Sequence, residues 1–288
     1  MSAFSSKTFK TDVYGFFRPH YPPQLFTALQ DYHKGDHKLA IDSGCGPGEA
    51  SFPLLRQLKF NKVIGTDLSQ VMVEKATRTR KPEEIDSISF ARCGASDLAS
   101  VGVENESVDL MTAAQCVHWF DTDTWFDEVL RVLKPGGTLA YWCYVDPYFL
   151  GAPEANKVYE NFTYGDKFLG PFWEQPGRSK IRGLYRDVNE AISKKKGFCD
   201  VQVVEFDPMH STSQTALSLR KTVTLENYLG YASTWSSHHK WTEANPGVKP
   251  DILDVFAKEL QTKVGWRLDT EIEIAWKTMY CFARKVVK

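Results

Sequence analysis

The sequence has few of the features that direct a protein to a membrane, to nucleic acid or to a metal ion. It lacks any run of about eighteen apolar residues, which excludes a membrane-spanning helix. The 35 lysines and arginines nearly balance the 36 aspartates and glutamates, so no net positive charge favours nucleic acid. The six cysteines form no C-x-x-C pair, which argues against a zinc site and a disulfide framework. Residues 1–12 hold no apolar signal-peptide segment. We therefore expect a cytoplasmic, metal-free monomer that binds neither nucleic acid nor membrane.

Short apolar segments alternate with helical segments between residues 38 and 145. The expected strands are 38–43, 62–67, 88–93, 108–113 and 138–144, and the expected helices are 49–58, 69–79 and 122–133. Strands that are separated by helices indicate a parallel sheet with helices on both faces. The expected fold class is therefore α/β.

The pattern changes after Asp146, where aromatic residues, proline and glycine become frequent. Two further strands are expected at 201–206 and 272–283, with helices at 225–235 and 252–264. We interpret residues 146–198 and 207–270 as insertions that form a cap. The cap is expected to lie over the carboxyl ends of the strands, where open α/β sheets bind ligands.

The most informative segment is Leu39–Glu49, in which an apolar strand runs into Asp42 and a loop with glycine at every second position. Glycine has no Cβ, so such a loop brings backbone N–H groups close to a ligand. A second strand ends in Asp67, whose carboxylate is positioned to accept hydrogen bonds from ribose hydroxyls. The G-x-G-x-G spacing, with Glu49 where a dinucleotide loop has its third glycine, argues against a pyrophosphate ligand. A nucleoside cofactor with an amino-acid tail and no phosphate suits the loop better, which describes S-adenosylmethionine.

These motifs resemble those of the class I S-adenosylmethionine-dependent methyltransferases. The matching strings are Ile41-Asp-Ser-Gly-Cys-Gly-Pro-Gly48, Gly65-Thr-Asp-Leu-Ser69 and Leu133-Lys-Pro-Gly-Gly-Thr138. The resemblance implies a Rossmann-like, mostly parallel sheet of seven strands whose last strand is antiparallel, with a helical cap from the insertions. Residues 38–145, 199–206 and 271–288 would form this core, and residues 1–37 a helical lid. The residues implied around the cofactor are Asp42, Gly44, Cys45, Gly46, Gly48, Asp67, Leu68, Met72, Ser96, Asp97 and Gln115.

Other strings are similar to those of the fungal trans-aconitate methyltransferase group. They are Tyr14 with Arg18-Pro-His-Tyr-Pro22, Cys116-Val-His-Trp-Phe120, Gly170-Pro-Phe-Trp-Glu-Gln-Pro-Gly-Arg178 and Trp235-Ser-Ser-His-His-Lys-Trp241. His238 departs from the group, which commonly has tyrosine there, and this leaves the shape of the acceptor pocket open. The resemblance implies that the chain esterifies a carboxylate of a small di- or tricarboxylic acid, and that this anionic acid is its partner.

The chemistry of such an acceptor agrees with the residues present. A carboxylate is already ionised at neutral pH, so the protein must align it, strip its water and balance its remaining charge. Arginine offers a bidentate fork for that charge, and the candidates are Arg18, Arg178 and Arg182. His118 follows the fourth strand and would either orient a carboxyl oxygen or act as a base. The remaining candidates are aromatic: Trp119 beside His118, Trp173 and Trp235 as walls, and Tyr14 and Tyr21 as hydrogen-bond donors.

Three alternatives stay open at this point. The chain could methylate a hydroxyl of a small secondary metabolite, with His118 as an obligatory base. It could be a nicotinamide-dependent oxidoreductase, against which the loop spacing and Asp42 argue. It could also be a methyltransferase-like interaction module without activity, which the intact glycines and Asp67 disfavour.

Overall fold

The computed structural model of the chain describes residues 18–211 and 213–287. Its strands are β1 (Leu39–Ser43), β2 (Lys62–Asp67), β3 (Ile88–Arg92), β4 (Val108–Ala114), β5 (Leu133–Phe149), β6 (Phe198–Phe206), β7 (Arg220–Thr224) and β8 (Glu271–Lys285). Its α-helices are α2 (Pro23–Tyr32), α3 (Ser51–Arg56), α4 (Gln70–Thr79), α5 (Thr122–Val132), α6 (Pro153–Tyr164), α7 (Gly177–Arg182), α8 (Arg186–Lys194), α9 (Leu225–Ala232), α10 (Ser236–Ala244) and α11 (Ile252–Val264). Short 3₁₀ turns are η2 (Pro82–Glu84), η3 (Leu98–Val101), η4 (Val117–Trp119) and η5 (Gly170–Phe172).

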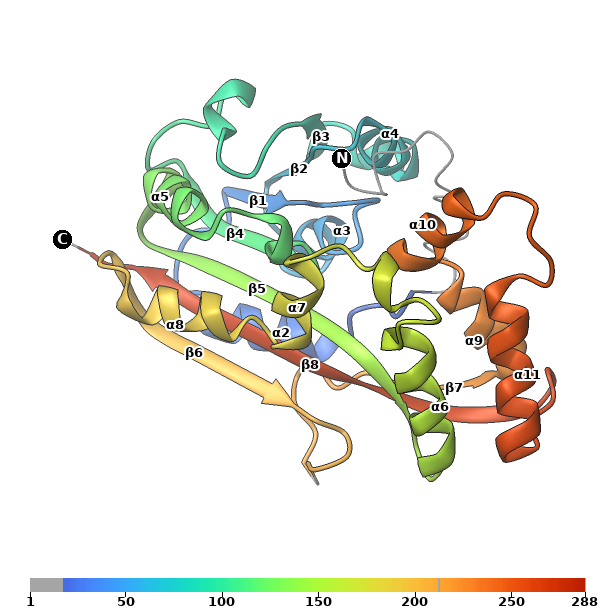
Figure 1. The fold of residues 1–288 in the computed structure, drawn as a ribbon. Coiled ribbons are helices and arrows are strands. Elements are labelled where there is room, and N and C mark those ends of the chain that lie inside the picture. Colours follow the sequence, from blue (N-terminus) through green and yellow to red (C-terminus); the bar gives the residue numbers. More distant parts are fainter. Residues whose placement is uncertain (1–17, 212, 288) are drawn as a thin grey trace.

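The strands form one twisted sheet in the order β3-β2-β1-β4-β5-β8-β6 (Figure 1). Strands β1 to β5 pair in parallel, and β8 runs antiparallel to both β5 and β6. This confirms the expected Rossmann-like sheet with an antiparallel last strand. An eighth strand, β7, pairs with the first residues of β8. The sequence did not predict β7, because its segment Arg-Lys-Thr-Val-Thr is short, polar and largely exposed.

Strand β5 is much longer than the expected 138–144, because it pairs with β8 from Thr138 to Phe149 and its first residue, Leu133, pairs with Val108 of β4. The pairing slips between Val145 and Pro147, and Asp146 there has a positive φ of 41°. The bulge turns Asp146 out of the regular alternation at the carboxyl end of the sheet. The longer strand therefore carries a carboxylate to the edge where ligands are expected.

Two apolar clusters fill the layers on the two faces of the sheet. Trp142 and Phe282 belong to the cluster that also contains Leu25, Phe26 and Leu29 of α2. Tyr141 and Cys281, whose side chains alternate with these, belong to the cluster built from α5 and α8. The sheet is thus covered on both faces, as parallel sheets are.

Helices α6, α9, α10 and α11 gather beyond the end of β5 and the start of β8 (Figure 1). Phe162 of α6 stacks on Phe256 of α11 with ring centroids 4.2 Å apart. The cap expected from residues 146–198 included too much, however. Val188 and Ile192 of α8 are buried with Trp125 of α5 against the sheet, so α8 belongs to the core layer. Likewise β7, within 207–270, is part of the sheet.

The lid expected from residues 1–37 falls partly on residues 1–17, which lie outside the described residues. Helix α2 is not a lid, since it packs on the sheet: Phe26 meets Trp142 edge to face. No described helix has the length and apolar character needed to cross a bilayer. Within residues 18–211 and 213–287, no group of three potential metal ligands is found, and all six cysteines are unpaired thiols.

Candidate active site

The first strand leads into a glycine loop that borders open space. Gly44 and Gly46 have φ angles of +65° and +53°, in the region that favours glycine. A Cβ added at Gly44 would lie 2.7 Å from the Cys116 side chain, whereas one at Gly46 would meet no atom within 4 Å. Gly44 therefore lets the loop pass the end of β4. Gly46 presents its backbone to a space that a ligand can fill.

Asp67, at the end of β2, fixes this loop through hydrogen bonds to backbone N–H groups. One carboxylate oxygen accepts a hydrogen bond from the N–H of Gly46 at 2.9 Å, and the other from the N–H of Ser69 at 2.8 Å. Burial raises the pKa of Asp67, and the two N–H donors oppose that rise. The carboxylate holds the loop and the start of α4 together at the cavity wall.

Asp42 and Gly48 do not border the cavity, which corrects their prediction as cofactor contacts. Asp42 is fully buried, and its carboxylate accepts hydrogen bonds from Ser51 at 2.5 Å and from Thr112 at 2.7 Å. Burial raises its pKa to about 6. Gly48 has a φ of +98° and lies against Phe52. Both residues support the conformation of the loop from its side away from the cavity.

A cavity of about 1190 Å³ runs from the glycine loop past the ends of β4 and β5 to the cap. The predicted cofactor residues that line it are Gly44, Cys45, Gly46, Asp67, Leu68, Met72, Ser96, Asp97 and Gln115. The predicted acceptor and catalytic residues that line it are Arg18, Tyr21, His118, Trp119, Trp173, Arg178 and Trp235. Arg182 does not line it, and Tyr14 lies outside the described residues.

The loop end of the cavity fits the phosphate-free cofactor that the sequence predicts. Leu68 is 66% exposed there and offers apolar surface to a planar base. Asp97 precedes η3 without capping it, so its carboxylate is not used as a helix cap. The carboxylate of Asp67 at the cavity wall would repel a pyrophosphate but suits hydroxyl groups, and the buried Asp42 behind the loop adds negative charge. Asp67, Gly46 and Leu68 are therefore the residues that would hold the cofactor.

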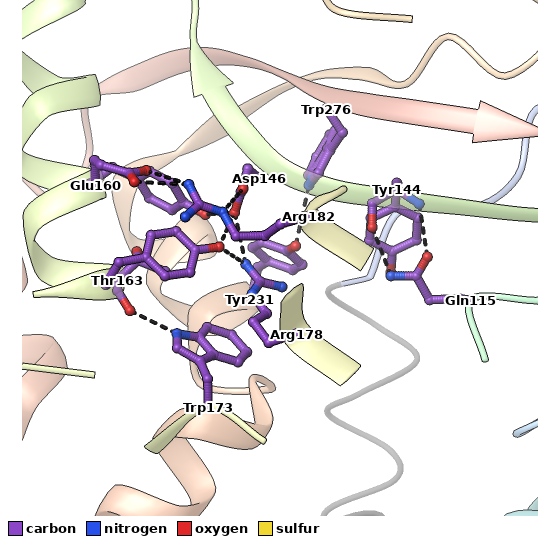
Figure 2. A network of polar contacts seen from close by, with 12 residues as sticks. Gln115, Tyr144, Asp146, Glu160, Thr163, Trp173, Arg178, Arg182, Tyr231 and Trp276 are labelled. Carbon is purple, nitrogen blue, oxygen red and sulfur yellow. Dashed lines mark hydrogen bonds and ion pairs between the residues drawn. The ribbon is translucent and has the colours of Figure 1, made fainter. Parts of the chain in front are cut away.

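Gln115 has a structural task in addition to its place on the cavity wall. Its amide donates to the carbonyl of Tyr144 at 2.9 Å and accepts from the N–H of Tyr144 at 2.8 Å (Figure 2). The residue has a positive φ of 59°. This pair of hydrogen bonds joins the residue that follows β4 to Tyr144 within β5, and both residues line the cavity.

His118 on η4, shortly after β4, also lines the cavity. Its Nδ1 is 2.8 Å from the hydroxyl oxygen of Tyr185. Burial, together with the positive charges of Arg178, Lys180 and Arg18, lowers the pKa of His118 to about 3. The imidazole is consequently neutral at physiological pH. Arg178, Lys180 and Arg18 place positive charge near the His118 ring.

Asp146 is the centre of a polar network at the cap end (Figure 2). Its carboxylate accepts from Arg178 and Arg182 at 2.8 Å each, from Tyr159 at 2.9 Å and also from Tyr164. Burial opposes ionisation of Asp146, but the two arginine charges outweigh it and lower its pKa. Asp146 therefore stays ionised and fixes both guanidinium groups.

The arginines of this end differ in their access to the cavity. Arg178 lines it, and its guanidinium carbon lies 3.9 Å from the Trp173 ring centroid. Arg182 extends from Asp146 to Glu160 at 2.8 Å, away from the lining, which corrects its prediction as a substrate contact. Arg18 also lines the cavity, where its guanidinium donates to the hydroxyl and carbonyl oxygens of Thr234 at 3.1 Å.

Sequence reasoning missed several residues of the cap end, namely Tyr144, Asp146, Tyr159, Tyr185 and Tyr231. Asp146 carried a usable signal, because a carboxylate near the end of a strand resembles Asp42 and Asp67. The tyrosines carried no such sequence signal, since an isolated tyrosine occurs as readily in an apolar core as in a binding site.

Comparisons with known proteins agree with this geometry. A family model described as a methyltransferase domain matches residues 40–137. The chain is 30% identical to the Saccharomyces cerevisiae protein CRG1, a probable S-adenosylmethionine-dependent methyltransferase, over 99% of this chain and 98% of that protein.

Two solved structures extend the comparison. A protein from Anaeromyxobacter dehalogenans assigned as a type II methyltransferase is 25% identical, with a TM-score of 0.69 over 94% of this chain and 99% of that one. Phosphoethanolamine N-methyltransferase 2 of Haemonchus contortus, solved with S-adenosyl-L-methionine, is 18% identical, with a TM-score of 0.51. It covers 96% of this chain and 57% of its own, and supports the fold alone.

Proposed function

We propose that this chain, which belongs to the S-adenosylmethionine-dependent methyltransferases, esterifies a carboxylate of a small di- or tricarboxylic acid of the trans-aconitate type. Bound S-adenosylmethionine supplies an electrophilic methyl group. The chain's own residues would then bind the acid, align one carboxylate oxygen with that methyl group, and keep water out.

The observation that carries the proposal is the state of His118. Methylation of a hydroxyl needs a base whose pKa lies near the working pH. The pKa of His118 is lowered to about 3 by its burial and by Arg178, Lys180 and Arg18. An imidazole with so low a pKa is a weak base, whereas a carboxylate acceptor needs none because it is already ionised.

The charges at the cap end support an anionic acceptor. Arg178 is held by Asp146, and Arg18 by Thr234, so both guanidinium groups are positioned before an acid arrives. Preorganised charge costs less on binding than charge on a mobile side chain. Trp173 and Trp235 line the same end and would exclude water around the acid.

The direct test is an acceptor screen with methyl-labelled S-adenosylmethionine and a panel of mono-, di- and tricarboxylic acids and phenols. We expect label in base-labile methyl esters of di- or tricarboxylic acids, detected by mass spectrometry. Label only in base-stable ethers of phenols would replace the proposal with the alternative, O-methylation of a hydroxyl on a small secondary metabolite. No label in any ester would also overturn it.

Replacing His118 with glutamine separates the two acceptor classes. The glutamine amide keeps an N–H donor but cannot act as a base. For a carboxylate acceptor we expect kcat/KM to fall less than about tenfold, whereas loss of a general base costs about 10²- to 10⁴-fold. His210→Gln, on an exposed histidine paired with Asp207, is the matched control. A fall of 10²-fold or more in His118→Gln alone would contradict the carboxylate assignment.

A further inference from the structure

The ring of His118 stands between Tyr185 and the cavity. Its Nδ1 faces the Tyr185 hydroxyl at 2.8 Å, and a Cβ added at Gly177 would lie 3.4 Å from its Cδ2 edge. His118 lines the cavity. Within the described residues its Nε2 has no hydrogen-bond partner, and it is not enclosed by other atoms. Nε2 is therefore the ring nitrogen that a bound molecule can reach.

The hydrogen between the Tyr185 hydroxyl oxygen and Nδ1 of His118 can be placed from the surroundings of Tyr185. Tyr185 is fully buried, and burial raises the pKa of its phenol well above the ordinary value, so the phenol keeps its proton. Among the residues that the structure describes, the acceptor for this O–H is Nδ1 of His118. A buried O–H without an acceptor is strongly unfavourable. The phenol therefore donates to Nδ1, and the neutral imidazole carries its own hydrogen on Nε2.

The backbone that presents Tyr185 is strained. Leu184 and Tyr185 have φ angles of 53° and 55°, two consecutive left-handed residues that are not glycine. The turn is held by the carbonyl of Leu184, which accepts from Asn189 at 3.1 Å. Asn189 in turn accepts from the Tyr141 hydroxyl at 2.8 Å. Strain of this kind persists where surrounding contacts over-determine it, and it gathers at functional sites.

We propose that Tyr185 is a positioning residue that holds His118 with Nε2–H directed into the cavity. His118 then acts as a hydrogen-bond donor to the acceptor carboxylate, at the oxygen that is not methylated, and not as a proton acceptor. The orientation of the ring and its hydrogen does not depend on the acceptor. Only the contact with a carboxylate rests on the proposed function.

The hydrogen position is measured by ¹⁵N NMR on histidine-labelled protein saturated with S-adenosylhomocysteine. The His118 signals are identified by their loss in His118→Gln. We expect Nε2 to carry the hydrogen and Nδ1 to show the resonance of a hydrogen-bond acceptor. Tyr185→Phe should move the Nδ1 resonance away from its hydrogen-bonded position. The control Tyr32→Phe, which removes a buried hydroxyl that donates to the carbonyl of Asp200 and lies outside the cavity lining, should leave it unchanged. A hydrogen on Nδ1 in the unaltered protein would overturn the proposal. An Nδ1 resonance that keeps the same position in Tyr185→Phe would also overturn it.

Kinetics supply the second readout, with the acid that the acceptor screen identifies. Tyr185→Phe should lower kcat/KM for that acid about three- to tenfold, the effect of one lost hydrogen bond, at an unchanged KM for S-adenosylmethionine. The control Tyr32→Phe should leave kcat/KM unchanged. An equal fall in kcat/KM in both variants would assign the effect to altered packing and would contradict the positioning role of Tyr185. If the screen finds no acid, the NMR arm still decides the His118–Tyr185 arrangement, so the two failures are distinguishable.

Discussion

Replacing Asp67 with alanine is expected to weaken binding of S-adenosylhomocysteine by about 10²- to 10⁴-fold. The carboxylate lies at the cavity wall and is proposed to accept hydrogen bonds from both ribose hydroxyls. Hydrogen bonds to a charged group contribute about 1.5–3 kcal/mol each, and about 1.4 kcal/mol corresponds to a tenfold change in affinity. The substitution also removes the hydrogen bonds to Gly46 and Ser69 that hold the loop. Isothermal titration calorimetry measures the change.

Two further variants make this result specific to Asp67. Asp67→Asn keeps one acceptor oxygen and should lose only about tenfold in affinity. Glu49→Gln neutralises another carboxylate of the cavity rim, one that pairs with the exposed His20 at 2.9 Å, and should leave the affinity nearly unchanged. Burial already disfavours the ionised form of Asp67, so Asp67→Ala should remain folded, which thermal unfolding checks. Affinity within threefold of the unaltered protein would refute the assignment.

The cofactor end could be read from the sequence because its determinants are local. Each determinant occupies a few consecutive residues: a strand, a glycine loop, and a carboxylate at the end of the next strand. Parallel strands bring their carboxyl ends to one edge of the sheet, so these residues lie close together. Asp42 and Gly48 were the exceptions. The place of Asp42 in the loop motif is clear, but only the packing of Ser51 and Thr112 around it reveals that it faces away from the cavity.

The cap end could not be read in this way, because its contacts join distant segments. Tyr185 contacts His118, which lies 67 positions earlier in the chain. A left-handed turn at Leu184 and Tyr185 makes this contact possible, and no glycine at either position predicts that turn. Arg178 and Arg182 are four residues apart on α7 and so share one helix face. Spacing alone could not tell which of them reaches the cavity. That difference depends on Asp146, whose position is set by the bulge between β5 and β8.

Replacing Arg178 with methionine is expected to raise KM for the acid substrate about 10²-fold, while the affinity for S-adenosylhomocysteine stays within about twofold. The guanidinium lines the acceptor end of the cavity and is fixed there by Asp146. Removing a buried cation from a charge-assisted contact with an anion costs about 2–5 kcal/mol. Methionine retains an unbranched apolar stem against Trp173, so the aromatic wall keeps a neighbour.

Arg182→Met is the matched control, because it removes the other arginine of the same Asp146 network, and the Arg182 side chain itself does not line the cavity. Both arginines lower the pKa of Asp146 against the effect of burial. A carboxylate with a lowered pKa stabilises the fold above its unfolded pKa, and this contribution is lost as the pH falls through the folded value. Loss of either arginine raises the folded pKa, so both variants should begin acid unfolding at a higher pH than the unaltered protein. Only Arg178→Met should also raise KM. If both variants raise KM equally, or neither does, Arg178 does not bind the acid, and the anion site must be sought at Arg18.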